Sequence, residues 1–248
     1  MIVGSANIEA LAEDAATIES FGTSEIVFED VVCFQMTMEM RNQAREAVLP
    51  KGLHPTVPAT LSMQAWEIGR SPFGEFKMVV CRIGCRSGVR ARGYSTRVYT
   101  NTQIAATALK QQFGCSTQLA EIDFRHSFDG TDVKVIFESR VIFEAACLDP
   151  EPMSNSDVQY TGTLNLAHTP NGLRLVQLEA HHVASQVERL SSRILSFDSE
   201  AWGNSLLDPY TVVSASLAYE TVTFPPVRFV CKPDELAFTG TESVEVFL

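Results

Sequence analysis

The sequence has little positive charge. It contains 19 Lys and Arg residues against 30 Asp and Glu residues, so its formal net charge is -11, and its isoelectric point lies near 4.9. An acidic surface repels phosphate backbones and anionic lipid headgroups. We therefore expect no nucleic-acid partner and no membrane partner.

We also expect no signal peptide in the given sequence and no membrane span. Residues 1–20 contain acidic side chains and no basic ones, unlike a signal peptide, and no run is long enough to span a membrane. We expect a cytoplasmic protein whose six cysteines are reduced and mostly buried. Cys81 and Cys85 would lie ~13 Å apart along a strand, too far to share one ion unless the chain turns near Gly84. We expect two small apolar residues there and no metal, and we also expect no cofactor.

What the sequence does contain is a series of segments rich in β-branched and aromatic residues, which are typical of strands. They cover residues 25–38, 60–68, 75–83, 93–99, 118–127, 132–147, 159–167, 173–187, 193–197 and 219–230. Pro225 and Pro226 interrupt the last segment, which favours an edge position in a sheet.

Two segments show helical spacing of apolar residues. Residues 41–48 predict a short helix, and a central helix is expected to begin after Asn101 or Thr102 and to end at Gly114. The whole pattern predicts a β-rich α+β fold, a closed or nearly closed antiparallel β-barrel with a central helix. We see no linker, and we predict one domain, residues 25–248, after an acidic N-terminal extension, residues 1–24.

The segment of residues 99–121 indicates a strand, a helix, a glycine stop, a turn and a new strand. It resembles the active-site segment of the acetoacetate decarboxylase superfamily, in which a helix ends in a Gly-x-Pro-Lys-Lys-Leu turn. One of the two lysines in that turn forms a Schiff base with the keto substrate. This chain has Gly-Cys-Ser-Thr-Gln-Leu at residues 114–119.

Further segments resemble the same family in order and spacing. They are Leu-Pro-Lys-Gly-Leu-His-Pro-Thr-Val-Pro at residues 49–58, Ser-Pro-Phe-Gly at residues 71–74, and Arg-Ile-Leu-Ser-Phe at residues 193–197. The resemblance implies an acetoacetate decarboxylase-like barrel that assembles as a homo-oligomer.

The catalytic residues of the family have no charged counterparts here. Thr117 falls on the Schiff-base lysine and Gln118 falls on its neighbour. The two active-site glutamates fall on Met63 and Met78, and the active-site arginine falls on Val31. The resemblance therefore implies an enzyme that does not use a Schiff base.

Uncharged residues of this chain fall at or near the positions of the family's active-site residues. We expect Val31, Met63 and Met78 to line a wide apolar pocket, together with Trp66 and Cys115. Plain core packing is the alternative for the two methionines.

The expected catalytic residues are four. Thr117 and Gln118 can orient a carbonyl or hydroxyl group, while Arg97 and Tyr99 share one strand face and can bind a carboxylate and donate a proton. A surface ion pair is the alternative for Arg97. His181 and His182 point to opposite sides of a strand, so only one of them can reach any one site.

We expect an enzyme, a lyase or an isomerase/cyclase of secondary metabolism, that acts on a bulky apolar carbonyl-containing metabolite. Its reaction would be a cyclisation, isomerisation, dehydration or non-imine decarboxylation. Two alternatives stay open. One is a conventional β-keto acid decarboxylase that uses an unrecognised lysine, and the other is a non-catalytic small-molecule-binding protein.

Overall fold

Most of the chain forms strands, as its β-branched and aromatic segments predict. The computed structural model describes residues 2–235 and 240–244. The strands are β1 (Ala16–Thr17), β2 (Ile26–Met40), β3 (His54–Pro55), β4 (Thr60–Arg70), β5 (Phe76–Ser87), β6 (Arg90–Thr100), β7 (Thr117–Leu119), β8 (Glu121–His126), β9 (Gly130–Phe137), β10 (Arg140–Pro152), β11 (Gly162–Thr169), β12 (Gly172–Leu178), β13 (His181–Phe197), β14 (Pro209–Phe224), β15 (Phe229–Cys231) and β16 (Thr241–Ser243). The helices are α1 (Ile8–Glu13), α2 (Asn42–Ala47), α3 (Gln103–Phe113) and a single 3₁₀ turn, Asn155–Asp157.

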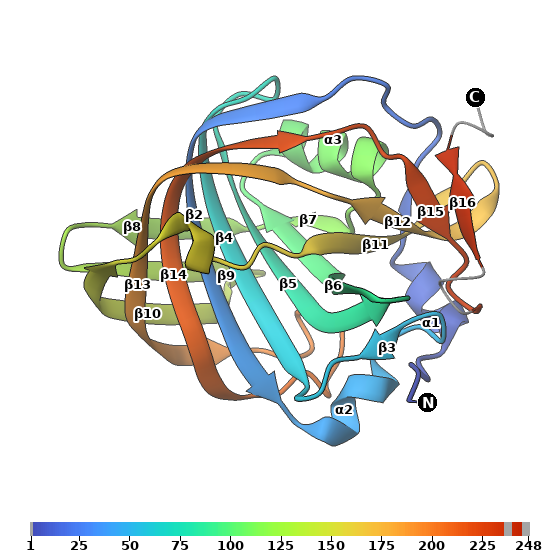
Figure 1. Ribbon diagram of the computed structural model, residues 1–248, viewed down its shortest axis with the longest axis horizontal. Coiled ribbons are helices and arrows are strands. Elements are labelled where there is room, and N and C mark those ends of the chain that lie inside the picture. Colours follow the sequence, from blue (N-terminus) through green and yellow to red (C-terminus); the bar gives the residue numbers. More distant parts are fainter. Residues whose placement is uncertain (1, 236–239, 245–248) are drawn as a thin grey trace.

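These strands form one strongly bent, mostly antiparallel sheet (Figure 1). Its order is β16-β15-β12-β11-β6-β5-β4-β2-β14-β13-β10-β9-β8, with β1, β3 and β7 attached to β11, β5 and β6. The β-rich α+β class is confirmed. The barrel is open, however, because the described strands end at β16 and β8 without pairing to each other.

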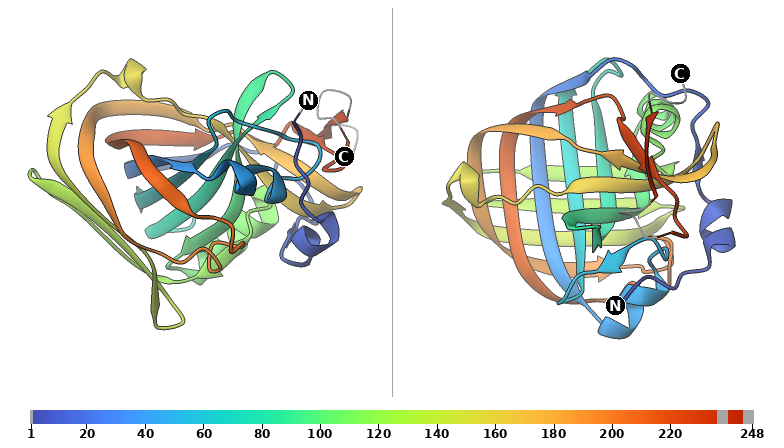
Figure 2. Two further views of the ribbon diagram at one scale, coloured as in Figure 1. Left: turned by 90° about the horizontal axis from the view of Figure 1, so that it is seen from below. Right: turned by 45° about the vertical axis from the view of Figure 1, so that its right-hand side comes forward.

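Both faces of the central strands are buried. On one face, Phe34, Met36 and Met63 pack with Val135 and Phe143 of β9 and β10. Figure 2 shows β8, β9 and β10 as a layer folded away from β2, β4 and β5. The opposite face, which we call the inner face, turns toward β11 and β12, which cross in front of it in Figure 1. The two sides of β2, β4 and β5 therefore belong to two separate apolar clusters.

Helix α3 closes one end of the inner face. Thr102 caps it by accepting a hydrogen bond from the backbone N–H of Ala105, and Gly114 ends it in the left-handed conformation at φ 68°. Ala105, Leu109 and Phe113 of the helix pack into the cluster of the inner face. After the turn, β7 pairs in parallel with β6. The predicted series of strand, helix, glycine stop, turn and strand is confirmed.

Several strand predictions differ from the structure. The segment 173–187 spans β12 and the start of β13, and the segment 193–197 is the end of β13 and not a separate strand. The segment 132–147 is a hairpin, because Glu138 and Ser139 adopt positive φ and turn the chain between β9 and β10. The segment 219–230 is not an edge strand. Its first part belongs to β14, which lies between β2 and β13, and the strand ends at Phe224 because Pro225 cannot donate a ladder hydrogen bond.

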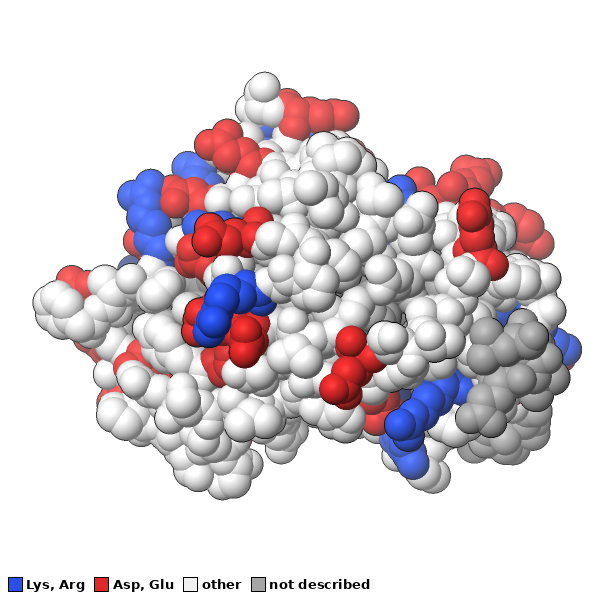
Figure 3. All heavy atoms as spheres, turned by 90° about the horizontal axis from the view of Figure 1, so that it is seen from above, with Lys and Arg blue, Asp and Glu red and all other residues white. Residues whose placement is uncertain are grey.

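The N-terminal segment lies against the sheet. The backbone N–H of Gly4 donates to Leu53 O, and β1 pairs with β11. The predicted end of the domain at residue 248 lies outside the described residues. Within the described part of the chain, no helix has the length and apolar character that crossing a membrane requires. Figure 3 shows one face of the molecule, on which acidic and basic side chains are scattered between broad uncharged areas.

The turn after α3 generates a stability prediction. Gly114 and Gly74 both have positive φ, but a Cβ at Gly114 would lie 2.7 Å from the Ala167 Cβ, whereas a Cβ at Gly74 would meet nothing within 4 Å. We expect Gly74→Ala to lower the free energy of unfolding by about 1 kcal/mol. Gly114→Ala should lower it by a further 1–3 kcal/mol or so, because of overpacking. Urea unfolding measures both, and equal losses would contradict the predicted clash.

Candidate active site

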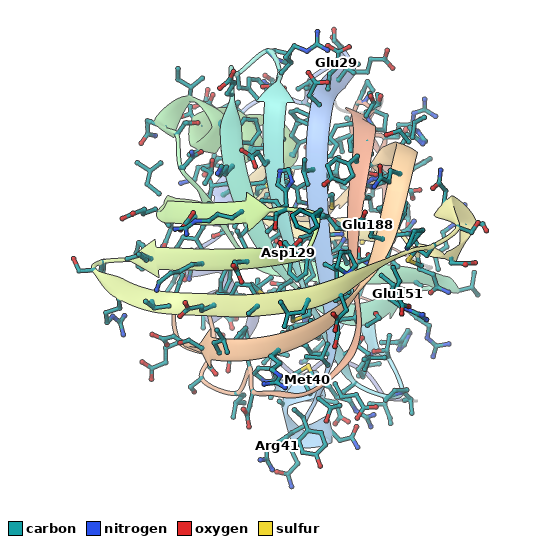
Figure 4. All side chains as sticks on the ribbon, turned by 90° about the vertical axis from the view of Figure 1, so that its left-hand side faces the viewer. Glu29, Met40, Arg41, Asp129, Glu151 and Glu188 are labelled. Carbon is teal, nitrogen blue, oxygen red and sulfur yellow. The ribbon has the colours of Figure 1, made fainter. Side chains whose placement is uncertain are left out.

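The inner face carries a gradient of polarity. Residues paired in register lie side by side on one face of a sheet, so β14, β2, β4 and β5 form rows. Figure 4 shows Glu29 and Met40 at opposite ends of β2. From the Met40 end toward the Glu29 end, the rows are Ser214-Thr37-Ser62-Arg82, Ser216-Gln35-Gln64-Val80, Ala218-Cys33-Trp66-Met78 and Glu220-Val31-Ile68-Phe76. The first two rows are mainly polar, and the fourth is apolar apart from Glu220.

A cavity of about 450 Å³ lies over the first two rows. We call it the barrel pocket. The segment 157–161 forms part of its opposite wall. Gln35 ties this wall to the sheet, because its Nε2 donates to Gln159 O over 3.3 Å, while the Gln35 Oε1 accepts a 2.6 Å hydrogen bond from Gln64 Nε2. The glutamine pair therefore separates the barrel pocket from the third and fourth rows.

Behind the glutamine pair lies a cluster of Tyr160, His182 and Glu220, which we call the acid–base cluster. Tyr160 Oη donates to Glu220 Oε2 over 2.8 Å, and His182 Nδ1 lies 3.1 Å from both carboxylate oxygens. The Tyr160 and His182 rings stack at 3.7 Å. The side chain of Glu220 is 0% exposed and that of His182 is 8% exposed. Because carboxylate oxygens only accept hydrogen bonds, this arrangement makes Nδ1 the protonated nitrogen of His182.

The surroundings of the acid–base cluster keep Tyr160 and the neighbouring thiol of Cys33 protonated and neutral. Burial, and then the charge of Glu220, raise the pKa of Tyr160 far above its usual value. Burial and the same carboxylate raise the pKa of the Cys33 thiol. Trp66 meets His182 edge to face at 5.8 Å, and its buried Nε1 has no hydrogen-bond partner among the described residues. The cluster therefore offers His182 Nε2 for proton transfer and the Trp66 N–H as a donor.

The sequence contains only a faint signal for this cluster. Tyr160, His182 and Glu220 are far apart in the chain and form no motif. Pairing of β13 with β14 sets His182 opposite Val222, two residues from Glu220 on the same face. The alternation of His181 and His182 was the available signal, since His181 is exposed while the His182 side chain is buried.

The predicted substrate-binding residues do not line the barrel pocket. Val31, Trp66 and Met78 lie on the inner face but are buried in its cluster. Met63 lies on the other face, where it pairs with Met36 and Cys81. The expectation placed both methionines in one cavity, but the register of β4 with β5 sets Met78 opposite Trp66 and so separates it from Met63. The structure shows core packing for both.

The turn after α3 is also packed. Thr117 Oγ1 donates to Ala106 O over 2.9 Å in a buried hydrogen bond, while Gln118 is half-buried and pairs with Tyr99. Cys115 accepts a hydrogen bond from Asn165 Nδ2, and burial raises the pKa of its thiol to about 12. None of these side chains lines the barrel pocket.

Arg97 and Tyr99 lie away from the barrel pocket. Arg97 Nη2 donates to Asp14 Oδ2 over 2.8 Å beside a separate cavity of about 310 Å³. Tyr99 Oη donates to Ala201 O over 2.7 Å, its ring packs on Trp202, and burial raises its pKa to about 12. The structure therefore does not bring the four expected catalytic residues to one cavity. Arg97 instead pairs with an acid, as its alternative predicted, although Arg97 itself is buried and not a surface residue.

Among the described residues, no lysine lines the barrel pocket. Lys77 lies near Glu67 and donates to Phe124 O. Lys134 and Lys232 pair with Glu144 and Glu235. An amine that attacks a substrate carbonyl must lie at the site where the carbonyl binds, and no residue of the pocket wall provides one.

Solved structures resemble this arrangement of strands. No family model matches the sequence, and no curated protein is significantly similar to it. The crystal structure of an acetoacetate decarboxylase from Legionella pneumophila superposes with a TM-score of 0.73 over 85% of this chain and 88% of that chain, at 14% identity. This chain has the acetoacetate decarboxylase fold.

Two further structures share the acetoacetate decarboxylase fold. The enduracididine biosynthesis enzyme MppR, complexed with pyruvate, has a TM-score of 0.67 over 84% of this chain and 90% of its own, at 15% identity. An acetoacetate decarboxylase-like enzyme from Sphingomonas wittichii RW1 has a TM-score of 0.69 over 84% and 93%, at 11% identity. At these identities the likeness shows the fold.

The buried thiol of Cys115 generates a pH prediction. Its pKa is about 12 in the folded chain, against 9.0 for an ordinary thiol. Above pH 9 the unfolded chain loses this proton while the folded chain keeps it, so stability is complete below that pH and falls as the pH rises toward 12.

We expect Cys115→Ser to flatten this fall by up to about 1.4 kcal/mol per pH unit. Urea unfolding of both proteins between about pH 8 and about pH 10 measures the difference in slope. Parallel slopes would show that the thiol ionises equally in the two states.

Proposed function

We propose that the protein is an enzyme that acts on a carbonyl-containing small molecule without a Schiff base, with His182 as its acid–base residue. The observation that supports this most is the buried acid–base cluster, which lies behind a pocket whose wall holds no lysine. Polar side chains are the majority of those that line the barrel pocket, although most of its exposed surface is apolar. We therefore propose that polar groups of the substrate lie there, and that the hydrogen-bonded pair of Gln35 and Gln64 moves aside so that the apolar part of the substrate reaches the row of Trp66 and Met78.

The chemistry follows from the roles of three side chains. Glu220 fixes the ring of His182 and leaves Nε2 free to remove a proton from the carbon next to a carbonyl group. The N–H of Trp66, which has no partner in the described chain, is available to the developing enolate oxygen. His182 then returns the proton to a different carbon or to a leaving group. Isomerisation, dehydration and aldol-type cyclisation share this proton removal, whereas a non-imine decarboxylation forms the same enolate by loss of CO₂ and needs His182 only to supply the proton that replaces it.

A protein with the same fold supports reactions of carbonyl compounds other than acetoacetate decarboxylation. MppR is a biosynthesis enzyme that has been observed with pyruvate and with the condensation product of pyruvate and imidazole 4-carboxaldehyde. The ligands observed in it therefore include carbonyl compounds other than acetoacetate. We propose a role of the same general kind, in secondary metabolism, for this chain.

Proton exchange tests the acid–base role without knowledge of the natural substrate. The protein is incubated in deuterated water with pyruvate, acetoacetate and levulinate, and loss of the protons next to the carbonyl group is followed by NMR. We expect exchange above the background rate, and a loss of about 100-fold or more in His182→Gln. His181→Gln is the matched control, because His181 is the exposed neighbour on the same strand, and it should retain the wild-type rate.

Borohydride trapping tests the absence of a Schiff base. The protein is treated with borohydride in the presence of pyruvate or acetoacetate, and its mass is measured. We expect no added mass. A stable adduct on any lysine would overturn the non-imine mechanism in favour of the decarboxylase alternative. Saturable binding without exchange or turnover of any compound would instead favour the small-molecule-binding alternative.

A further inference from the structure

Three arginines line the barrel pocket, and they differ in their partners. Arg92 forms an ion pair with Glu179, and Arg189 forms one with Glu151. Arg82 is buried, with only 3% of the residue exposed. Nevertheless, no carboxylate of the described residues lies within 4.0 Å of its guanidinium. It is the cation of the pocket wall whose charge the described chain does not balance.

The chain nevertheless builds a defined place for Arg82. Its Nη1 donates to Thr161 O over 3.0 Å and to Thr163 Oγ1 over 3.1 Å. Gly93 lies beneath the side chain, where a Cβ would come within 3.0 Å of the Arg82 Cδ. The buried Nε has no hydrogen-bond partner in the described chain, and the hydrogen bonds of the guanidinium within that chain are those of Nη1. One edge of the guanidinium is thus fixed, and the other edge is unused.

A buried cation without a counter-ion is unfavourable, because it has lost water and gained no opposite charge. Burial accordingly lowers the pKa of Arg82 to about 10, which still leaves the group charged at neutral pH. A ligand carboxylate in the barrel pocket would supply the missing charge, and its two oxygens match the two free N–H groups of the fork. A phosphate dianion would need a second free cation, and Arg92 and Arg189 are already paired.

We propose that Arg82 is the carboxylate-binding residue of the barrel pocket, so that the substrate is a carboxylic acid with its anionic end in the first row. Its other end then points along the inner face toward the acid–base cluster. This subsite differs in place from the arginine position that the family resemblance indicates, because that position falls on Val31 in the fourth row. The inference deepens the proposed function and rests on it only for the claim that the bound acid is the substrate.

Binding of levulinate and of its uncharged methyl ester tests the proposal, since the two differ in one negative charge. Dissociation constants are measured by NMR titration of the full-length protein. We expect wild type to bind levulinate at least about 10-fold more tightly than the ester, because hydrogen bonds to charged groups contribute most. Arg82→Gln should bind the two compounds equally. Arg82→Lys, which keeps the charge but loses the fork, should fall between them.

Arg92→Gln is the matched control, because Arg92 is also a buried arginine of the pocket wall but has Glu179 as its partner. We expect it to change levulinate affinity by less than about 3-fold, below the effect of a charged hydrogen bond. Equal binding of acid and ester by wild type, or undiminished levulinate binding in both Arg82 variants, overturns the subsite. The first and third rows lie ~13 Å apart along β4, farther than levulinate extends, so Arg82-dependent binding of levulinate bears on the subsite alone. The proposed reaction stands or falls separately, with the proton-exchange comparison of His182→Gln and His181→Gln.

Discussion

The burial of one carboxylate shapes the centre of this fold. Glu220 has no exposed side-chain surface, so its charge must be met by hydrogen-bond donors from the protein. Tyr160 and His182 supply them, and Cys33 lies close enough for the carboxylate to raise its thiol pKa. Because Tyr160 comes from the segment that precedes β11, the same carboxylate also holds the wall of the barrel pocket over the sheet.

The polarity of the inner face runs in an unexpected direction. The resemblance to the decarboxylases places the family's charged residues near Val31, Met78 and Thr117, and these positions are packed with α3 and a group of phenylalanines. Phe28, for example, contacts Phe76 and Phe224 edge to face. Polar side chains lie instead at the other end, in the rows of Ser62 and Gln64. The fold is shared with the decarboxylases, and in this chain the polar side chains of the inner face lie at the end of the strands away from Val31.

Local signals made the frame of the fold predictable from sequence. Thr102 and Gly114 mark the two ends of α3 through capping rules that depend only on neighbouring residues, and both act as expected. The turn at Glu138 and Ser139 lacks the Gly or Asn that usually accompanies positive φ, so the hairpin of β9 and β10 was not foreseen. Residue type alone thus located the helix better than the strands.

Rules based on neighbouring residues could not predict the site. Which side chains meet there depends on the pairing register between strands that are far apart in the sequence. Whether Met63 shares a face with Met78 depends on the pairing of β4 with β5, and a shift of one residue reverses every side chain. The meeting of His182 with Glu220 depends similarly on β13 and β14, whose ladder contains a register shift between Ala184 and Gln186. No property of the single residues encodes these offsets.

Two buried charges of opposite sign remain unpaired with each other, and this separation connects the two proposals. Glu220 raises the pKa of Cys33 and Arg82 lowers it, so the thiol lies within the field of both groups. If stability alone governed the site, a direct ion pair or two apolar residues would be cheaper than two separated charges. Separated charges are useful where a ligand carries the complementary ones. An anionic end at Arg82 would then orient the molecule so that proton transfer takes place near His182, where the negative field of Glu220 stabilises the imidazolium formed when Nε2 accepts a proton.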